Sequence, residues 1–180
     1  MSLAVELHIV PDRARVGCKG PAAEAWLAEQ GIPVPSGANR YALAASGVLA
    51  GRLATSEFLL EAVDQRAATV IEGLRDRLER SEYPRGVYPV LRQDFVLEIS
   101  GQDRQALFLQ TCAVDLVPIE RQSTGEAGPL VMTSIIGVSV VLTCQQHATG
   151  PRFTVWSDPS YRHYFHSELH NIVGELPHEP

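Results

Sequence analysis

V-G-C-K-G-P-A-A-E-A-W-L-A at residues 16–28 and L-E-I-S-G-Q-D-R-Q-A-L-F-L at residues 97–109 follow one pattern. Each stretch begins as an apolar strand, reaches a glycine (Gly20 or Gly101) and continues as a helix. The helices carry paired apolar residues at matching offsets, which are Trp26 with Leu27 and Leu107 with Phe108. The match predicts that one strand–helix unit occurs twice in this chain.

The repetition extends to the later part of each half. Phe58 opens an apolar strand and is followed by a helical pattern that reaches Leu74. Phe153 and Leu169 stand in the same relation, with the same spacing. Two halves with one order of strands and helices indicate a pseudo-symmetric α+β fold.

Each half approximates the order β-α-β-β-α with a further strand, which is the ferredoxin-like pattern. The predicted fold is α+β, with two pseudo-repeated ferredoxin-like halves, antiparallel sheets and helices packed on one face. Residues 81–89 hold two prolines and Gly86 and form the predicted linker. The halves are then residues 1–84 and 85–180, within one compact unit.

Local patterns add finer predictions. Asp64 and Asp158 are predicted helix N-caps, and S-G-Q-D at residues 100–103 fits a capping box. Residues 120–129 are polar and glycine-rich, which predicts a mobile connection. Residues 130–143 read either as two strands that meet at a central glycine or as one long bent strand.

Composition bounds the class of protein. The chain has 180 residues, of which 45% are hydrophobic and 20% charged, as in ordinary globular proteins. Its formal net charge of −6 argues against a nucleic-acid partner, which would need a basic surface. No apolar window approaches the length of a membrane-spanning helix, and the N-terminus lacks the basic start of a signal peptide. We expect a cytoplasmic protein without membrane partners.

The three cysteines are Cys18, Cys112 and Cys144. Their odd number and wide spacing fit neither a disulfide framework nor a metal site, so we expect reduced, buried thiols. Lys19 beside Cys18 can lower a thiol pKa, but no histidine lies nearby in sequence to act as a base. The glycine-flanked Lys19 also precedes a helix, a place that can hold an anion. The alternative there is a tight turn with a solvated lysine.

Three histidines, His163, His166 and His170, fall on the last predicted helix, within about 60° of arc. The apolar stripe of that helix, about 140° away, consists of Tyr161, Phe165, Leu169 and Ile172. The histidines should therefore face solvent. His166 and His170 have the i, i+4 spacing of metal sites, but no third-ligand motif such as H-E-x-x-H accompanies them. A polar, weakly titrating face without a metal is expected.

No catalytic set can be assigned from motifs. The chain has no G-x-S-x-G, no G-x-G-x-x-G after a strand and no clustered acid pair. Trp26 and Trp156 are interpreted as core or interface aromatics rather than stacking platforms. Asp115 stands between a predicted helix end and an apolar stretch, where it is by local sequence a turn or cap residue.

A series of short motifs carries a resemblance to a known family. The motifs are K-G-P-A-A-E-A-W-L (19–27), P-S-G-A-N (35–39), L-A-T-S-E-F-L-L (53–60), D-F-V-L-E-I-S-G (94–101), C-A-V-D-L (112–116) and F-T-V-W-S-D-P-S-Y-R-H-Y (153–164). In this order they resemble the gamma subunit of heterotetrameric sarcosine oxidase. That family is grouped with the folate-binding aminomethyltransferases typified by the T protein of the glycine cleavage system.

The resemblance implies a domain of two ferredoxin-like halves and a small subunit without a flavin site. Such a subunit packs against larger chains that carry flavin, NAD and folate chemistry. In folate-binding relatives an aspartate after the helix of the second half contacts the pterin, and Asp115 resembles it. The transferases place an asparagine before that aspartate, whereas this chain has Val114. They are also longer, so a complete folate pocket would need a partner.

Two hypotheses of function follow. The first is a non-catalytic, gamma-type subunit that supports sarcosine demethylation and folate-linked one-carbon metabolism, partnered by larger flavin- and folate-binding subunits. The second is a stand-alone aminomethyltransferase-like protein that binds tetrahydrofolate at Asp115; a homodimer in isolation is a further alternative. A deep cleft near Asp115 favours the second, and a shallow surface with an exposed apolar patch favours the first. Aromatic interface anchors are expected among Trp26, Tyr83, Tyr88 and Tyr161.

Overall fold

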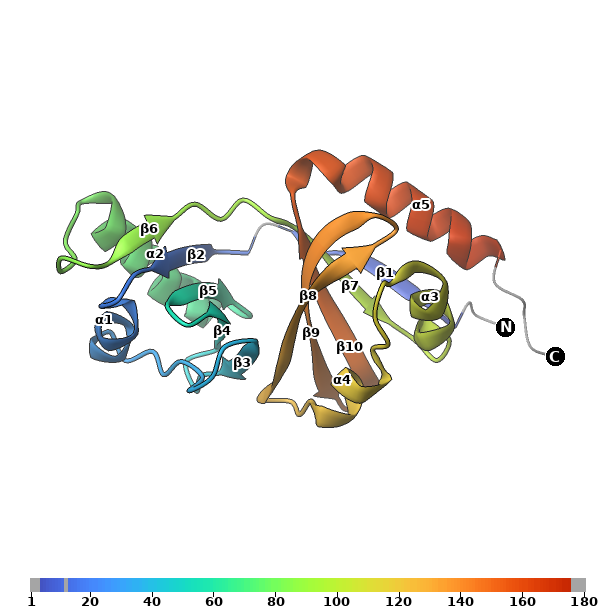
Figure 1. Ribbon diagram of the computed structural model, residues 1–180, viewed down its shortest axis with the longest axis horizontal. Coiled ribbons are helices and arrows are strands. Elements are labelled where there is room, and N and C mark those ends of the chain that lie inside the picture. The colour runs from blue at the N-terminus through green and yellow to red at the C-terminus, as the bar shows by residue number, and fades with distance from the viewer. Residues whose placement is uncertain (1–3, 12, 176–180) are drawn as a thin grey trace. The chain divides into compact units, whose positions relative to one another are not determined.

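The computed structural model describes residues 4–11 and 13–175, which form two compact units (Figure 1). Unit 1 consists of the N-terminal segment up to Pro11, Asp94–Gly125 and the chain from Val131 onward. Unit 2 consists of the intervening segment up to Gln93 and of Glu126–Leu130.

These bounds differ from the predicted halves 1–84 and 85–180. The first strand, β1 (Glu6–Ile9), pairs antiparallel with β7 (Phe95–Ser100) in unit 1. The N-terminal segment therefore belongs to unit 1, whereas the residues that follow it in the chain belong to unit 2. The reason is that β1 forms its hydrogen bonds with β7, a strand from the C-terminal half of the sequence.

Unit 2 alternates strands and helices along the chain. Its elements are β2 (Arg15–Lys19), α1 (Ala23–Glu29), β3 (Arg40–Leu43), β4 (Val48–Ala54), β5 (Glu57–Ala62), α2 (Gln65–Glu79) and β6 (Tyr88–Val90). Neighbouring strands are antiparallel, in the order β3-β4-β5-β2-β6. Asp64 caps α2 as predicted, since its Oδ1 accepts the Ala67 N–H at 2.8 Å.

Unit 1 holds β1, β7 and the later elements. These are α3 (Arg104–Thr111), α4 (Val117–Gln122), most of β8 (Ala127–Ile135), β9 (Val138–His147), β10 (Gly150–Ser157), the 3₁₀ turn η1 (Pro159–Tyr161) and α5 (Arg162–Glu175). The strand order is β1-β7-β10-β9-β8. The start of β8 pairs antiparallel with β3 of unit 2, so β8 belongs to both units. An α+β fold with antiparallel pairing is confirmed.

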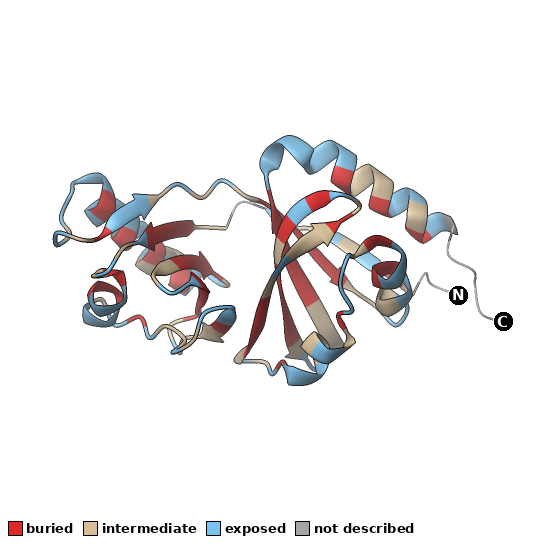
Figure 2. Ribbon diagram, in the orientation of Figure 1, coloured by how far each residue is buried: buried red, intermediate tan, exposed pale blue. Residues whose placement is uncertain are grey.

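Each unit has its own apolar core between its helices and one face of its strands. Figure 2 shows buried residues on the helices and on the strands of each unit. The repeated apolar residues occupy matching places. Trp26, Leu27, Phe58 and Leu74 lie in the core of unit 2, while Leu107, Phe108, Phe153 and Leu169 lie in that of unit 1. The spacing that repeats in the sequence is therefore the spacing of inward-facing positions.

In unit 2 the corner between β2 and α1 depends on Gly20. This residue has a φ of 118°, which favours glycine. A Cβ at Gly20 would overlap the carbonyl oxygen of Gly86, just before β6. The same oxygen accepts the Ala22 N–H at 3.1 Å, beside the start of α1. The missing side chain thus admits the backbone that leads into β6.

Unit 1 builds the same corner at Gly101, which has a φ of 103°. A Cβ there would overlap the carbonyl oxygen of Ala4, just before β1. That oxygen accepts the Asp103 N–H at 3.0 Å. In both corners the carbonyl accepts the N–H of the second residue after the glycine. The carbonyl belongs to the segment before β6, which follows α2, in unit 2 and to the segment before β1 in unit 1.

Three local predictions are corrected. Residues 120–129 contain the end of α4 and the start of β8 rather than one mobile connection. The capping box at 100–103 is wrong, because the Ser100 hydroxyl donates to Glu6 Oε2 at 3.1 Å and Asp103 makes no side-chain cap bond. The predicted linker 81–89 contains the start of β6, whose partner β2 is distant in sequence.

Residues 130–143 fall within two strands, β8 and β9, as in the first of the two alternatives. The turn between them consists of Ile136 and Gly137, with φ values of 45° and 78°. Two successive residues with positive φ form the tight turn that suits the right-handed twist of a hairpin.

Replacing Gly101 with alanine should destabilise the protein more than the matched change Gly150→Ala. Gly150 has a similar φ of 112°, but a Cβ there would meet nothing within 4 Å. Gly150→Ala therefore carries only the backbone cost of about 1–3 kcal/mol, whereas Gly101→Ala adds overlap with Ala4, roughly a further 1–3 kcal/mol. Urea unfolding measures both, and equal losses in the free energy of unfolding would contradict the proposed corner.

Candidate functional site

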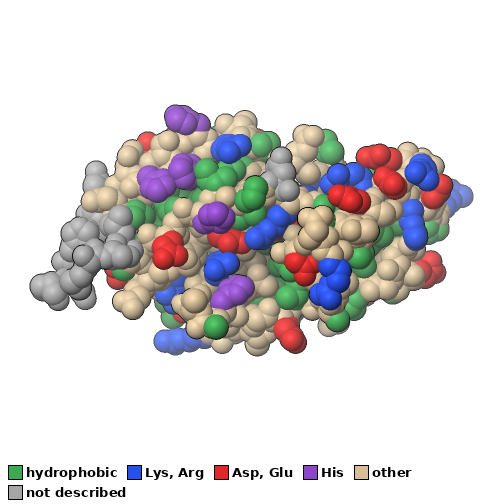
Figure 3. All heavy atoms as spheres, turned by 180° about the vertical axis from the view of Figure 1, so that it is seen from behind, with side chains coloured by type: hydrophobic (Ala, Val, Ile, Leu, Met, Phe, Trp, Pro, Cys, Tyr) green, Lys and Arg blue, Asp and Glu red, His purple; other side chains and the backbone are tan. Residues whose placement is uncertain are grey.

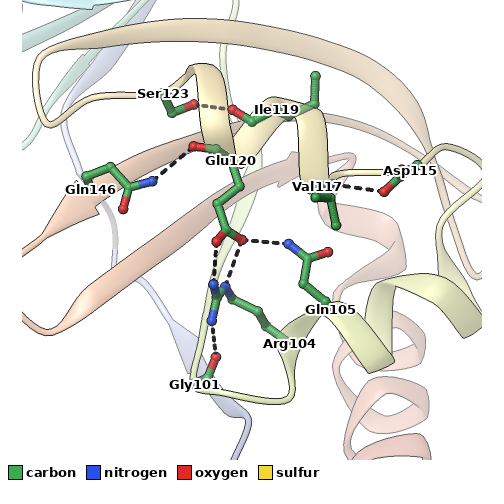
Figure 4. A network of polar contacts seen from close by, with 9 residues as sticks. All are labelled: Gly101, Arg104, Gln105, Asp115, Val117, Ile119, Glu120, Ser123 and Gln146. Atoms are coloured by element: carbon green, nitrogen blue, oxygen red, sulfur yellow. Dashed lines mark hydrogen bonds and ion pairs between the residues drawn. The ribbon is translucent and has the colours of Figure 1, made fainter.

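Asp115 lies in the short connection between α3 and α4 of unit 1, shown in Figure 4. Its side chain is exposed, and its Oδ1 accepts the Val117 N–H at 2.9 Å. It therefore starts α4 by satisfying an N–H at the helix N-terminus. The prediction of a turn or cap residue is confirmed. Its Oδ2 makes no hydrogen bond with any residue that the structure describes.

A carboxylate-centred network fixes α4 against α3. Glu120 of α4 accepts from Arg104 Nε at 3.0 Å and from Arg104 Nη2 at 2.5 Å, so the ion pair is bidentate. Gln105 Nε2 adds a bond to the same carboxylate at 2.6 Å. Arg104 Nη1 also donates to the Gly101 carbonyl at 2.7 Å. The position of Asp115 is thus tied through α4 and α3 to the glycine corner.

The far end of α4 is held as well. Gln146 Nε2, on β9, donates to the Glu120 carbonyl at 3.0 Å, and the Ser123 hydroxyl donates to the Ile119 carbonyl at 2.8 Å. A helix of six residues has little stability of its own. These side-chain bonds therefore account for an element that the sequence did not predict.

The surface beside Asp115 is shallow. The cavity there measures about 140 Å³ and includes Leu109 and Val114 in its lining. Ligand pockets usually have a volume of roughly 300–1,000 Å³. Leu109 is 76% exposed and Val114 43% exposed, although both are apolar. Of the two geometries considered from the sequence, the structure has the shallow surface with exposed apolar side chains.

Two of the three thiols, Cys18 and Cys144, are buried, and burial opposes their ionisation. Burial raises the pKa of Cys18 to about 12. Burial, followed by the Glu120 carboxylate, raises the pKa of Cys144 to about 12. Cys112 is half-buried, and none of the three is in a disulfide. A reactive thiolate at Cys18, favoured by Lys19, is therefore contradicted, because burial outweighs the neighbouring charge.

The histidines of α5 lie on a face of unit 1 where Figure 3 shows several histidine side chains at the surface. His163 and His170 are exposed, and His166 is half-buried. The Nε2 atoms of His166 and His170 are 3.1 Å apart. No group of three or more histidine, cysteine or acidic residues is placed to hold a metal among residues 4–11 and 13–175.

The remaining predicted residues divide between core and surface. Trp26 is 3% exposed and lies in the core of unit 2, so its proposed role as an interface anchor is wrong. Trp156 is also buried. Tyr88 and Tyr161 are exposed, whereas Tyr83 packs against the core of unit 2. The prediction that Tyr161 belongs to the apolar stripe of the last helix is wrong, because this residue lies in η1, before the helix begins.

One set of charged residues was missed by the sequence analysis. Arg13, Arg15, Arg75 and Arg92 line a cavity of about 720 Å³ in unit 2. Three separate segments supply them. In the sequence only the R-x-R spacing at residues 13–15 indicated the cluster, and of these two arginines Arg15 opens β2 while Arg13 lies before it.

The structure contains no helix, among the residues described, that is long and apolar enough to cross a membrane.

Comparison with known proteins places the fold. No family model and no curated protein matches the chain in sequence. A chain of the heterotetrameric sarcosine oxidase from Corynebacterium sp. U-96, solved in complex with pyrrole 2-carboxylate, is similar in structure, with a TM-score of 0.72 and 22% identity. The similarity covers 98% of this chain and 87% of that one.

A second solved structure is the glycine cleavage system aminomethyltransferase T from Bartonella henselae, with a TM-score of 0.64 and 13% identity. The similarity covers 92% of this chain but 45% of that one, so this chain spans less than half of the transferase. The chain has the fold of these two proteins. The resemblance that the sequence motifs carry is thereby confirmed at the level of the fold.

His166→Gln should reduce the loss of stability in acid. Burial first, and then the charges of His170, Arg162 and His163, hold the pKa of His166 below its ordinary value of 6.5. The unfolded chain therefore binds this proton more readily, so the contribution to stability is complete above 6.5 and is lost as the pH falls through the lower pKa. Thermal unfolding from about pH 7.5 to about pH 5 measures the effect.

As the pH falls in that series, the wild type should lose more stability than His166→Gln. The His170→Gln variant should lose an intermediate amount, because it removes one of the charges that lower the pKa of His166. An unchanged acid loss in His166→Gln would show that the histidine pair does not set this pH dependence.

Proposed function

We propose that this chain is a non-catalytic, gamma-type subunit of a sarcosine-oxidase-like complex, working in the cytoplasm beside larger flavin- and folate-binding subunits. In that role it supports sarcosine demethylation and folate-linked one-carbon metabolism. The observation that carries the proposal is the extent of structural similarity. This chain matches 87% of a sarcosine oxidase chain but only 45% of the aminomethyltransferase.

The surface around Asp115 supports a role in contact rather than catalysis. Leu109, at 76% exposure, and Val114 stand beside a cavity of only about 140 Å³. Exposed apolar side chains lose unfavourable contact with water when a partner covers them. The Arg104–Glu120 pair holds this surface in place, so a partner would meet a preformed patch.

We propose further that both units are copies of one ferredoxin-like motif. In unit 2 the order β6-β2-β5-β4 is that of a split β-α-β, and unit 1 has the corresponding order β1-β7-β10-β9. The matching glycine corners support this assignment. The fourth strand of unit 1 is then β1, from the N-terminal segment, which pairs antiparallel with β7.

For Asp115 we propose contact with tetrahydrofolate only within the assembled complex. A carboxylate can accept two N–H bonds from a pterin edge, but Oδ1 already accepts the Val117 N–H. The shallow surface provides no walls for the planar ring, so a partner subunit would have to supply them. The chain alone is proposed to bind no cofactor.

Co-expression with the flavin-bearing sarcosine oxidase subunits of the same genome should yield one stable complex. Leu109→Asp should reduce recovery of those subunits at least about tenfold, because a charge placed in an apolar contact costs more than 1.4 kcal/mol. Met132→Asp on β8, with 56% exposure in the parent, is the matched control and should retain them. Failure of the wild-type chain to co-purify would remove the basis of the proposal.

Tetrahydrofolate should show no Asp115-dependent binding to the isolated chain at about 1 mM in calorimetry, because the cavity beside Asp115, at about 140 Å³, is well below the usual pocket volume of roughly 300 Å³ or more. In the complex, Asp115→Asn should weaken binding, whereas Asp103→Asn, an exposed aspartate without a side-chain cap bond in the same unit, should not. Submillimolar binding to the chain alone that Asp115→Asn weakens and Arg75→Gln does not would support a stand-alone folate protein instead.

A further inference from the structure

The cavity of about 720 Å³ in unit 2 combines charge with apolar walls. It is formed by the start of β2, the last turns of α2 and the segment 89–93. Val16, Leu78 and Val90 contribute apolar surface, and four arginines face one glutamate, Glu79, in its lining. Its volume falls within the range of roughly 300–1,000 Å³ that small-molecule sites occupy.

The carboxylate of Glu61 positions Arg15, which opens β2, and Arg13, which lies just before it. Arg15 Nε donates to Glu61 Oε2 at 2.8 Å, and Arg13 Nη1 lies 3.5 Å from Glu61 Oε1. Glu61 is 1% exposed. A buried carboxylate shared by two guanidinium groups limits the orientations that those groups can adopt, so the arginine side of the cavity is ordered before any ligand arrives.

Arg92 is positioned from the segment after β6. Its Nη2 donates to Glu57 Oε1 at 3.2 Å. Gly17 on β2 allows the segment that carries Val90 and Arg92 to lie close to this strand. A Cβ at Gly17 would lie 3.0 Å from Val90 Cβ and 3.2 Å from Arg92 Cγ. Gly17 and Arg15 lie on the same face of β2, since side chains alternate along a strand. The absent side chain thus brings the segment 90–92 against the arginine face.

Arg75 on α2 differs from the other three arginines. Its Nη2 donates to the Arg15 carbonyl at 3.1 Å, and it makes no ion pair with a carboxylate among the residues described. A guanidinium has five N–H donors in a fixed fork, and this bond uses one of them. Arg75 is therefore held at the cavity with donors left for an anion.

We propose that this cavity binds an organic anion in which a carboxylate or phosphate group is attached to an apolar body. Arginine forks match the paired oxygens of both headgroups, and Arg75 would make the decisive contact. Val16, Leu78 and Val90 would cover the apolar body. The proposal does not depend on the oxidase role, because every lining residue belongs to unit 2 of this chain.

Calorimetry on the full isolated chain tests the proposal with four probes. Phenyl phosphate and benzene-1,3-dicarboxylate combine an aromatic body with the two headgroups, inorganic phosphate lacks the body, and benzamide lacks the charge. The two aromatic anions should bind at concentrations below about 10 mM. Each should bind at least about tenfold more tightly than benzamide, which loses a charge-assisted contact, and at least about tenfold more tightly than inorganic phosphate, which has no apolar body to bury. The tighter of the two anions identifies the headgroup.

Two variants locate the site. Arg75→Gln should weaken the aromatic anions at least about tenfold, the equivalent of one lost charge-assisted bond. Arg77→Gln removes the same charge from an exposed position of α2 outside the cavity and should leave the affinity unchanged. Gly17→Ala, by displacing Val90 and Arg92, should also weaken binding. Absence of binding, equal binding of benzamide, or equal effects of Arg75→Gln and Arg77→Gln would overturn the proposal.

Discussion

The strand–helix corner at a glycine is the constraint on which the rest of this structure depends. In each unit a backbone carbonyl occupies the space that a side chain would fill, at Gly20 and at Gly101, and accepts an N–H beside the next helix. At Gly101 the same corner also anchors Arg104, which holds Glu120 and so places α4 and Asp115. The close approach of a backbone carbonyl to each glycine therefore positions the neighbouring edge strand and the start of the following helix. In unit 1 it also positions the surface beside Asp115.

The described residues form two candidate sites, a shallow surface beside Asp115 in unit 1 and an arginine-lined cavity in unit 2. The cores of the two units are apolar, and burial raises the pKa of two thiols to about 12, so these groups contribute packing rather than nucleophiles. The shallow apolar surface beside Asp115 suits contact with a larger subunit, and the arginine-lined cavity of unit 2 suits an anion. Because all residues of each site lie within one unit, the two can be tested independently.

Sequence patterns predicted what depends on local periodicity. The helix that reaches Leu74, its Asp64 cap and the paired core residues of the repeat all follow from spacing along one element. Elements that depend on distant partners were missed. The strand β6 is only three residues long and requires β2, while α4 requires Arg104 and Gln146. Ser100 has the right neighbours for a capping box, but Glu6, 94 positions away, binds its hydroxyl.

The most direct measurement is native mass spectrometry of the tagged chain purified from its own cells under gentle conditions. If the chain is a small subunit, the measured mass should be that of an assembly that contains this chain and flavin-bearing sarcosine oxidase subunits. In an activity assay, any free chain should not turn over sarcosine. A mass equal to the chain alone or to its dimer, together with folate-dependent aminomethyl transfer by that species, would contradict the account.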